Sequence, residues 1–306
     1  MGVIGIDTSN YTTSIAFFDG TGGENCSKLL PVKSGELGLR QSDAVFAHIK
    51  SLPELSGRLF SHVREEIRAV GVSTRPRAVE GSYMPCFLVG LSHATLLSDV
   101  LHVPLVEVSH QQGHVAASLW SAGHLELMDA PHLAWHLSGG TTELLLVEPE
   151  GKLVKCTKIG GTTDISAGQL IDRTGQLLGL PFPSGKHLDA LSREAAGKDF
   201  FRVKCKDMTF SFSGMQNKVQ QYFEANGDPA ETAAYALRCV AYGVFHATQQ
   251  ALKAYPGLPV VFSGGVASNS LLRQVLEPLN PIFAQPQYST DNAMGVAVLA
   301  SRCTEV

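Results

Sequence analysis

The sequence has few features of a membrane, secreted or strongly charged protein. No segment reaches the roughly 18 consecutive apolar residues that a membrane-spanning helix needs, and no basic stretch followed by an apolar run opens the chain. Charged residues make up only 17% of the 306, and 24 basic against 28 acidic side chains leave a formal charge of −4. Any contact with nucleic acid must therefore come from a local basic patch. We expect a cytoplasmic globular protein.

Paired cysteines are also missing. The chain has six cysteines but no C-x-x-C motif, which argues against a zinc ribbon or a redox dithiol. We expect the thiols to be reduced and mostly buried. They are Cys26, Cys86, Cys156, Cys205, Cys239 and Cys303.

Short β-rich apolar runs alternate with longer stretches of helical apolar spacing, and this alternation predicts an α/β protein. The predicted strands cover 3–6, 14–18, 70–73, 105–108, 133–137, 144–147 and 260–263. The predicted helices cover 42–70, 90–101, 167–178 and 229–255.

Two segments resemble each other: G-I-D-T-S-N-Y-T-T-S-I-A-F-F-D near the start and W-H-L-S-G-G-T-T-E-L-L-L-V-E-P in the middle. Each reads as a strand, a tight turn of small residues and a returning strand. The repeat suggests two duplicated domains that face a cleft. The alternative is that small-residue turns between strands are common in any α/β fold.

Three turns rich in glycine, serine and threonine cover 7–13, 138–142 and 263–269. Such turns can direct several backbone N–H groups at one phosphate. The third is predicted to run from a strand directly into a helix, with Asn269 placed to reach over a ligand. Because the chain lacks both a P-loop and a G-x-G-x-x-G motif, three such turns favour a cleft nucleotide site of the actin, sugar-kinase and chaperone-ATPase type over purely structural turns.

His110 and His114 stand four residues apart at the start of a helical stretch, so their rings share one face and can bind one metal. With 11 histidines in 306 residues, this spacing also arises by chance. His132 and His136 have the same spacing but lie on a predicted strand, where it separates the rings by about 13 Å. Taken alone, the first pair favours ordinary surface or core histidines over metal ligands, and a metal site needs a third ligand.

Asp291 is a candidate for that third ligand. Thr290 is predicted to cap the last helix, and the small residues Ala293, Gly295 and Ala297 would let this helix approach other backbone closely. The alternative is an acid that favours the helix dipole in the first turn. Two imidazoles and one carboxylate form a ligand set that suits Zn²⁺ or Fe²⁺, and either ion could act as a Lewis acid.

An ordered series of motifs across nearly the whole chain resembles the TsaD/Gcp family of tRNA threonylcarbamoyl transferases. The series comprises G-I-D-T-S, H-x-x-x-H, S-G-G-T-T-E-L, G-G-T-T-D-I-S-A-G-Q-L-I-D-R, F-P-S-G-K-H-L-D, F-S-F-S-G, V-V-F-S-G-G-V-A-S-N-S-L-L-R and T-D-N-A. The resemblance implies an actin-like (ASKHA) duplicated two-lobed fold with mixed sheets and a central cleft. We expect one lobe at 1–115, joined by a C-terminal helix at 290–306, and the other at 116–289.

The resemblance also implies roles for particular residues. His110, His114 and Asp291 match the metal ligands of the family, and no catalytic residue is expected beyond them. The positions that match substrate and nucleotide contacts are Leu137, Ser138, Gly139, Gly140, Thr141, Asp172, Gly185, Asp189 and Asn269. Aspartates can accept hydrogen bonds from ribose hydroxyls, and glycine allows close backbone approach.

By the same resemblance, the chain would transfer a threonylcarbamoyl group from its adenylate to N6 of an adenosine in tRNA. The implied cofactors are one divalent metal, Fe or Zn, and an adenylate nucleotide, either threonylcarbamoyl-AMP or ATP/ADP. The implied partners are tRNA, a smaller TsaB-like actin-fold paralogue that forms a heterodimer, and an ATPase of the same pathway. No membrane is involved. Catalysis would depend on positioning and electrostatics.

Several acids common in the family are absent. An acidic pair of the family is replaced by Tyr11 and Thr12. The family has a glutamate between the two histidines, where this chain has Gln111-Gln112-Gly113. Acids are also common at the positions of Ile165 and Gln169. These losses would weaken the orientation of the histidines and could change the acceptor, which makes a divergent paralogue conceivable.

A longer, more basic segment, S-T-R-P-R-A-V-E-G-S-Y, replaces the family's glycine-proline turn. Arg75 and Arg77 in this segment are hypothesised to contact an anionic acceptor or partner. The alternative is a solvated loop.

Three other functions are alternatives to the transferase. A non-catalytic, nucleotide-binding scaffold or regulatory paralogue is the main alternative. A sugar-kinase-like phosphotransferase is compatible with the fold, although fold alone does not determine chemistry. A metalloprotease is disfavoured because H-Q-Q-G-H lacks the glutamate of H-E-x-x-H.

Overall fold

The computed structural model describes residues 1–9, 11–31 and 39–304. It divides into two compact units: unit 1 comprises Met1–Ala130, Glu148–Cys156 and Asp291–Val306, and unit 2 comprises Pro131–Val147 and Thr157–Thr290. The boundary expected between 115 and 116 instead falls inside a helix, α3 (His110–Ala122). All of α3 lies in unit 1, where it packs against α9 (Met294–Thr304), and the chain leaves unit 1 only after Ala130.

Unit 1 is built on a five-stranded mixed sheet in the order β3-β2-β1-β4-β5. Its strands are β1 (Gly2–Thr8), β2 (Thr12–Phe18), β3 (Gly23–Leu29), β4 (Ile67–Arg75) and β5 (Leu105–Ser109). Its helices are α1 (Gln41–His62), α2 (Phe87–Leu101), α3 and α9 (Met294–Thr304), with a 3₁₀ turn η1 (Leu125–Asp129).

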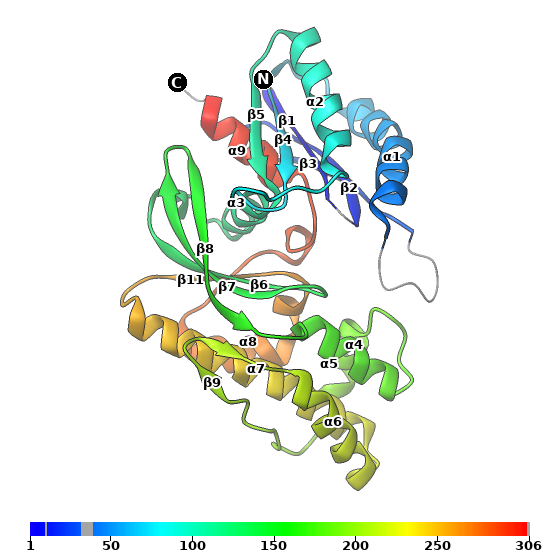
Figure 1. Ribbon diagram of the computed structural model, residues 1–306, viewed down its shortest axis with the longest axis vertical. Helices are drawn as coiled ribbons and strands as arrows, with labels where there is room; N and C mark the ends of the chain where they lie inside the picture. Colours follow the sequence, from blue (N-terminus) through cyan, green and yellow to red (C-terminus); the bar gives the residue numbers. More distant parts are fainter. Residues whose placement is uncertain (10, 32–38, 305–306) are drawn as a thin grey trace. The chain divides into compact units, whose positions relative to one another are not determined.

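Side-chain alternation along β1 explains how this sheet is covered (Figure 1). Ile4 and Ile6 are buried in the core formed with α1 and α2, whereas Val3 packs on the opposite face against α9. Gly5 faces α9 as well, and a Cβ there would lie 2.4 Å from the Ala293 carbonyl oxygen. Glycine at this strand position therefore allows α9 to approach the sheet backbone.

Unit 2 contains a seven-stranded sheet in the order β12-β11-β6-β7-β8-β10-β9. Its strands are β6 (His132–Leu137), β7 (Thr142–Glu150), β8 (Leu153–Thr162), β9 (Cys205–Lys206), β10 (Thr209–Phe210), β11 (Val260–Ser263) and β12 (Ile282–Phe283). The segment Glu148–Cys156, which ends β7 and begins β8, belongs to unit 1. Its helices are α4 (Ala167–Leu177), α5 (Gly185–Ser192), α6 (Ser213–Asn226), α7 (Pro229–Ala254) and α8 (Ser270–Leu276), with 3₁₀ turns η2 (Gly265–Ser268), η3 (Glu277–Leu279) and η4 (Pro286–Tyr288).

The two sheets share one topology. In unit 1, β1 is antiparallel to β2 and parallel to β4, which is parallel to β5. In unit 2, β6 is antiparallel to β7 and parallel to β11, which is parallel to β12. The two similar sequence segments form the equivalent hairpins β1–β2 and β6–β7. The predicted duplication is therefore confirmed, and β9 and β10 are additions to unit 2.

The core of unit 2 lies between its sheet and the helix α7, 26 residues long. Trp135 of β6 is fully buried there, and its indole N–H donates to Thr248 Oγ1 of α7 at 2.9 Å. Asp228 caps α7 by accepting from the backbone N–H groups of Ala230 and Glu231. The strong cap and the apolar face together fix α7 against the sheet.

All seven predicted strands are present, but two helix predictions need correction. The helix predicted over 42–70 ends at His62, because Ile67–Arg75 pairs with β1 and β5 as a strand. The last helix begins at Met294 and not beside Thr290, since Ala293 N–H bonds to the Asn25 side chain and residues before it stay outside the helix.

Cysteine burial is as expected only in part. All six thiols are free; Cys26, Cys86 and Cys239 are buried, and the other three are half-buried. Across residues 1–9, 11–31 and 39–304, none of the helices combines the length and apolarity needed to cross a bilayer.

Candidate metal centre and nucleotide-binding turns

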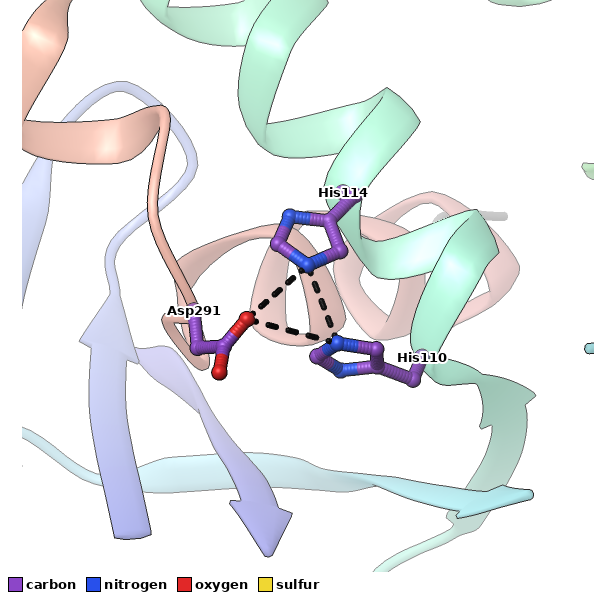
Figure 2. A group of neighbouring side chains, drawn as sticks. All are labelled: His110, His114 and Asp291. Atoms are coloured by element: carbon purple, nitrogen blue, oxygen red, sulfur yellow. Dashed lines mark hydrogen bonds and ion pairs between the residues drawn. The ribbon is translucent and has the colours of Figure 1, made fainter. Parts of the chain in front are cut away.

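Helix α3 presents two histidines from its first two turns. It begins directly after β5, where Ser109 and Gln112 form a capping box: the Ser109 side chain accepts from Gln112 N–H, and the Gln112 side chain accepts from Ser109 N–H. Because residues four apart share a helix face, the Nε2 atoms of His110 and His114 lie 2.9 Å apart (Figure 2).

Asp291 reaches the same point from the segment before α9. Its Oδ1 lies 3.5 Å from His110 Nε2 and 3.2 Å from His114 Nε2. The three ligand atoms lie within 4.8 Å of one another. Metal–ligand bonds of about 2.0–2.2 Å place neighbouring ligand atoms at such separations, so these three side chains can hold one divalent cation. All three lie in unit 1.

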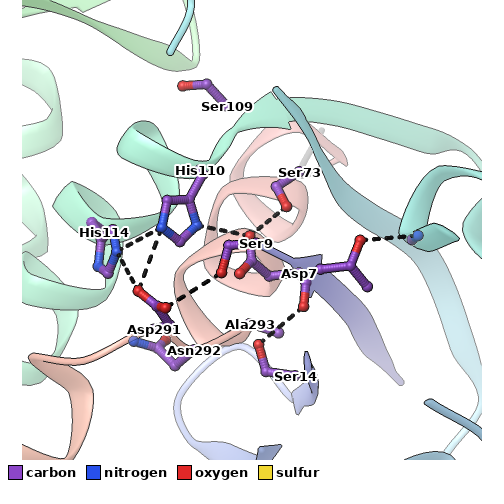
Figure 3. A network of polar contacts seen from close by, with 12 residues as sticks. Asp7, Ser9, Ser14, Ser73, Ser109, His110, His114, Asp291, Asn292 and Ala293 are labelled. Carbon is purple, nitrogen blue, oxygen red and sulfur yellow. Dashed lines mark hydrogen bonds and ion pairs between the residues drawn. The ribbon is translucent and has the colours of Figure 1, made fainter. Parts of the chain in front are cut away.

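Asp7, at the end of β1, holds His110 from the other side of the ring (Figure 3). His110 Nδ1 lies 2.9 Å from Asp7 Oδ1, and the Ser73 hydroxyl donates to the same oxygen. A carboxylate on Nδ1 favours the tautomer that leaves Nε2 free for a metal. Ser9 in turn donates to Asp291 Oδ2 at 3.4 Å. Asp7 and Ser9 lie in the turn predicted over 7–13 to bind phosphate, but their place beside the histidines was not predicted, and neither was Ser73.

The histidines and carboxylates perturb one another's pKa values. Burial raises the pKa of Asp291, but hydrogen bonds from His110 and His114 outweigh it and hold the pKa well below 3.8. Burial lowers the pKa of His110, but the negative charges of Asp7 and Asp291 raise it well above 6.5. The carboxylates thus make this position favourable for positive charge, which a proton or a cation can supply.

Close packing between α3 and α9 fixes the position of the histidines. A Cβ on Gly295 of α9 would lie 1.9 Å from the Gly113 carbonyl oxygen and 2.7 Å from the Ala117 nitrogen. Gly5 and Gly295 thus let α9 approach the sheet and α3 closely. The predicted approach of the small residues of the last helix to other backbone is confirmed.

The second turn predicted to bind phosphate, 138–142, joins β6 to β7 and packs against the N-terminus of α4. Ser166, which caps α4, donates to the Gly139 carbonyl at 2.6 Å, and Thr142 Oγ1 accepts from Ala167 N–H at 2.8 Å. A Cβ on Gly139 or Gly140 would meet no described atom within 4 Å. The tip of the turn, formed by Gly139 and Gly140, is therefore open to a ligand, and Ser138 and Thr141 beside it are half-buried. Leu137 is fully buried as the last residue of β6.

The third turn packs beside the second. Gly264 has φ +91°, and a Cβ there would lie 2.1 Å from the Leu137 carbonyl oxygen, so glycine is required on both counts. The predicted direct passage into a helix is wrong: the 3₁₀ turn η2 intervenes before α8. Asn269 Oδ1 accepts from Leu272 N–H and so caps α8, and its Nδ2 donates to Asp189. Its reach over a ligand on the turn stays a prediction.

The remaining predicted nucleotide contacts also lie in unit 2. Asp189 accepts from Asn269 and Ser270 and pairs with Arg193 at 2.9 Å. Asp172 accepts from Ser184 N–H at 2.8 Å, and burial raises its pKa. A Cβ on Gly185 would meet nothing within 4 Å among the described atoms. Asp189 and Asn269 are thus brought together, and nucleotide contact by any of these residues stays a prediction.

Comparison with known proteins identifies the family. The family model for TsaD, described as tRNA N6-adenosine threonylcarbamoyltransferase, matches residues 41–298. This chain belongs to the TsaD family. A relative named as that transferase from Carboxydothermus hydrogenoformans is 31% identical, with 96% of this chain and 90% of the relative covered. Another of that name from Thermosipho africanus is 30% identical, with 97% and 92% covered. The resemblance expected from the motifs is confirmed, and the family is one of acyltransferases.

Solved structures confirm the actin-like fold. HypF from T. kodakarensis aligns with a TM-score of 0.61 at 13% identity over 99% of this chain and 47% of that one. A ROK family glucokinase from Streptomyces griseus aligns with a TM-score of 0.55 at 11% identity over 99% of this chain and all of that one. At such identities the likeness concerns the fold alone.

Two of the positions where this TsaD chain departs from the family's acids have a structural explanation. Gln112 and Gln169 occupy equivalent positions in the capping boxes of α3 and α4. A glutamine side chain accepts from the N-cap N–H as a glutamate does. Gln112 also donates to the Val154 carbonyl at 2.7 Å, which a carboxylate cannot do. The capping boxes of α3 and α4 are therefore kept, although each lacks the negative charge that the family's acid would supply.

The other departures are less informative. In the turn predicted over 7–13, Asn10 lies outside the described residues. Arg75 ends β4 opposite Ser109 and is half-buried, and Arg77 is exposed. The Pro76 carbonyl accepts from Gln111 N–H at 3.0 Å, so the basic segment contacts the start of α3. Contact of these arginines with an anionic acceptor stays a prediction.

Proposed function

We propose that this TsaD chain transfers a threonylcarbamoyl group from threonylcarbamoyl-AMP to N6 of adenosine in tRNA, with a divalent cation held by His110, His114 and Asp291. The observation that carries the proposal is the convergence of two imidazole Nε2 atoms and one carboxylate oxygen within 4.8 Å. Family membership supplies the class of reaction.

The donor set fits a resident Fe or Zn ion. Imidazole and carboxylate suit both metals, and three protein ligands leave positions for substrate oxygens. When bound, the cation would supply a Lewis acid for the carbamoyl and threonyl oxygens of the donor. Asp7 keeps His110 Nε2 available by accepting from Nδ1, and Ser9 orients the Asp291 carboxylate.

The open turns of unit 2 are proposed to hold the adenylate of the donor. The tip formed by Gly139 and Gly140 leaves space for a ligand beside backbone N–H groups. Gly185 leaves space in the same way, and the raised pKa of Asp172 reflects its burial near a turn. These residues would bind and orient AMP as the leaving group.

The described thiols give little support to a covalent enzyme intermediate. Burial raises the pKa of Cys86 and Cys205 to about 11 and that of Cys156 to about 12, so these thiols are protonated near neutral pH. Direct attack by the adenine amine on the positioned donor is therefore the simplest reaction, with catalysis by proximity and electrostatics.

The proposal includes protein partners and a cytoplasmic setting, where tRNA is found. We expect a heterodimer with a smaller TsaB-like paralogue, assisted by an ATPase of the pathway. In unit 1, exposed apolar side chains on α1 and α2 offer a surface for the paralogue. They are Phe46, Ile49, Leu88, Leu96, Val100 and Leu101.

Adding threonylcarbamoyl-AMP and unmodified tRNA to the purified chain, with and without the paralogue, tests the function. Formation of threonylcarbamoyl-adenosine, measured by mass spectrometry of digested tRNA, is the expected result. Nucleotide binding without product in both mixtures would instead support the scaffold function.

A further inference from the structure

A basic segment in unit 2 lies outside the metal centre and the predicted nucleotide turns. Lys198–Lys206 contains four basic side chains and one acidic side chain, Asp199, which leaves a local charge of +3 in a chain of net charge −4. The acidic Asp207 follows it. Because the chain as a whole cannot attract a polyanion by net charge, such a local patch is what binding of nucleic acid requires.

The backbone of this segment is fixed along α7. Near its start, Glu231 of α7 accepts from Gly197 N–H at 2.8 Å. In the middle, the Arg238 side chain donates to the Asp199 carbonyl at 3.3 Å, and at the end Gln250 Nε2 donates to the Cys205 carbonyl at 3.1 Å. These three anchors are spread along one long helix, about two and then more than three turns apart. The basic side chains therefore project from a rigid support.

The burial pattern places three basic residues on one side. Val203 is only 4% exposed and Cys205 is half-buried, whereas Arg202, Lys204 and Lys206 are exposed. The chain pairs as a strand at β9, Cys205–Lys206, and the alternating burial continues back to Arg202. Alternate residues of an extended chain lie about 7 Å apart, a spacing similar to that of neighbouring phosphates along a nucleic-acid strand. Among the residues that the structure describes, these three form no ion pair. We call Arg202, Lys204 and Lys206 the basic strip.

Aromatic rings accompany the strip. Phe200 and Phe201 are each 37% exposed. Phe200 stacks on Tyr242 of α7 with ring centroids 4.1 Å apart, and the Lys218 ammonium lies 5.6 Å from the centre of the Phe201 ring. Exposed rings held by such contacts can stack on unpaired bases, and cationic side chains beside them can contact phosphates.

We propose that the basic strip, with Phe200 and Phe201, is a surface that binds the sugar-phosphate backbone and unpaired bases of RNA. The inference rests on the proposed function, since it identifies the part of unit 2 that contacts the tRNA acceptor. Regularly spaced charges match the phosphates of RNA, and the adjacent aromatic rings can stack on its bases. An acidic protein partner would need neither feature, so both favour RNA as the ligand.

The test compares tRNA binding by the wild-type chain and by the variant Arg202→Glu, Lys204→Glu, Lys206→Glu over a range of salt concentrations. If three phosphate contacts are lost, the slope of log K against log salt becomes shallower by about two, and binding weakens at least tenfold at low salt. The matched control is Lys50→Glu, Lys152→Glu, Lys253→Glu, which changes net charge equally at dispersed positions and should show a much smaller effect. Circular dichroism checks that both variants fold.

A second variant, Phe200→Ala with Phe201→Ala, should weaken binding of unmodified tRNA by fivefold or more with little change in the salt slope, because stacking releases no counterions.

Equal loss of affinity in the strip variant and the dispersed control would overturn the proposal. So would loss of binding to the paralogue with tRNA binding intact, which would assign the strip to a protein partner. If the wild-type protein modifies tRNA and the strip variant binds tRNA normally, the basic strip is not the tRNA-binding surface, and the proposed function stands. If the wild-type protein binds tRNA without modifying it, the proposed function is wrong, and the assignment of the strip is unaffected.

Discussion

At the scale of single residues, Asp7 shows how one buried side chain controls the candidate metal centre. It is 0% exposed, yet only its Oδ1 has hydrogen-bond partners, His110 and Ser73, among the described residues. A buried carboxylate with one unpartnered oxygen is costly for stability, and such a cost is common at functional sites.

Replacement of Asp7 by Asn should weaken metal binding by about 10- to 100-fold. The amide oxygen is a weaker acceptor for His110 Nδ1–H, so Nε2 is less firmly presented. Competition with a chelator gives the dissociation constant, and ¹⁵N NMR of His110 reports its tautomer. Asp43→Asn on the exposed start of α1 is the control. Unchanged affinity together with an unchanged tautomer would mean that Asp7 does not position His110.

Asp164 shows a different role for a carboxylate. It accepts from Phe212 N–H at 2.8 Å, from Ser213 N–H at 3.2 Å and from the Ser211 hydroxyl, so it caps α6 from a distant part of the chain. Burial raises its pKa, but these hydrogen bonds outweigh it and lower the pKa well below 3.8.

Replacement of Asp164 by Asn should lower the free energy of unfolding by about 1 kcal/mol at pH 7, a typical value for a lost cap. The native pKa lies below that of the unfolded chain, so this stabilisation is present above pH 4 and declines as pH falls further. Urea unfolding at pH 7 and pH 3.5 measures it. A difference between variant and wild type that grows at the lower pH would refute the assignment.

At the scale of helices, the starts of α3 and α4 explain two of the missing acids. Both begin with a serine and a glutamine in a capping box. Gln112 is 2% exposed, whereas Gln169 is exposed. The same change from glutamine to glutamate should therefore have different consequences at the two positions.

Gln112→Glu should destabilise the protein by about 1–3 kcal/mol, because a buried charge replaces the donor to the Val154 carbonyl. Gln169→Glu is the matched control and should change stability by less than about 0.5 kcal/mol. Urea unfolding at pH 7 compares them. Equal effects would show that burial of Gln112 does not constrain this position.

The contact between α3 and α9 gives a second prediction for helices. Gly295→Ala should destabilise the protein by about 3 kcal/mol, since its Cβ would overlap the backbone of Gly113. Gly57→Ala in α1 meets nothing within 4 Å in the described structure and should stabilise by up to about 1 kcal/mol. Thermal unfolding checks both. A tolerated Gly295→Ala would mean that the helices can separate without cost.

At the scale of the whole molecule, the sequence predicts what is local or repeated. Strand periodicity was sufficient for the α/β class, and the spacing of His110 and His114 was sufficient for their shared helix face. The two similar hairpins suggested the duplication, which the matching sheet topologies then confirmed. Asp7 and Ser73 meet His110 only through pairing of β1 with β4 and of β4 with β5. Contacts set by strand register carry no signal in a single sequence. The start of α9 was misplaced because it depends on another long-range contact, the hydrogen bond from Ala293 N–H to the Asn25 side chain.

The most direct test of the account is the metal content of the purified chain, measured by mass spectrometry of the elements. Wild-type protein and the control His124→Ala, which changes an exposed histidine paired with Glu126, should each bind one Fe or Zn ion per chain. His110→Ala, His114→Ala and Asp291→Ala should each lose most of it. Equal metal content in all five proteins would contradict a metal centre at these residues.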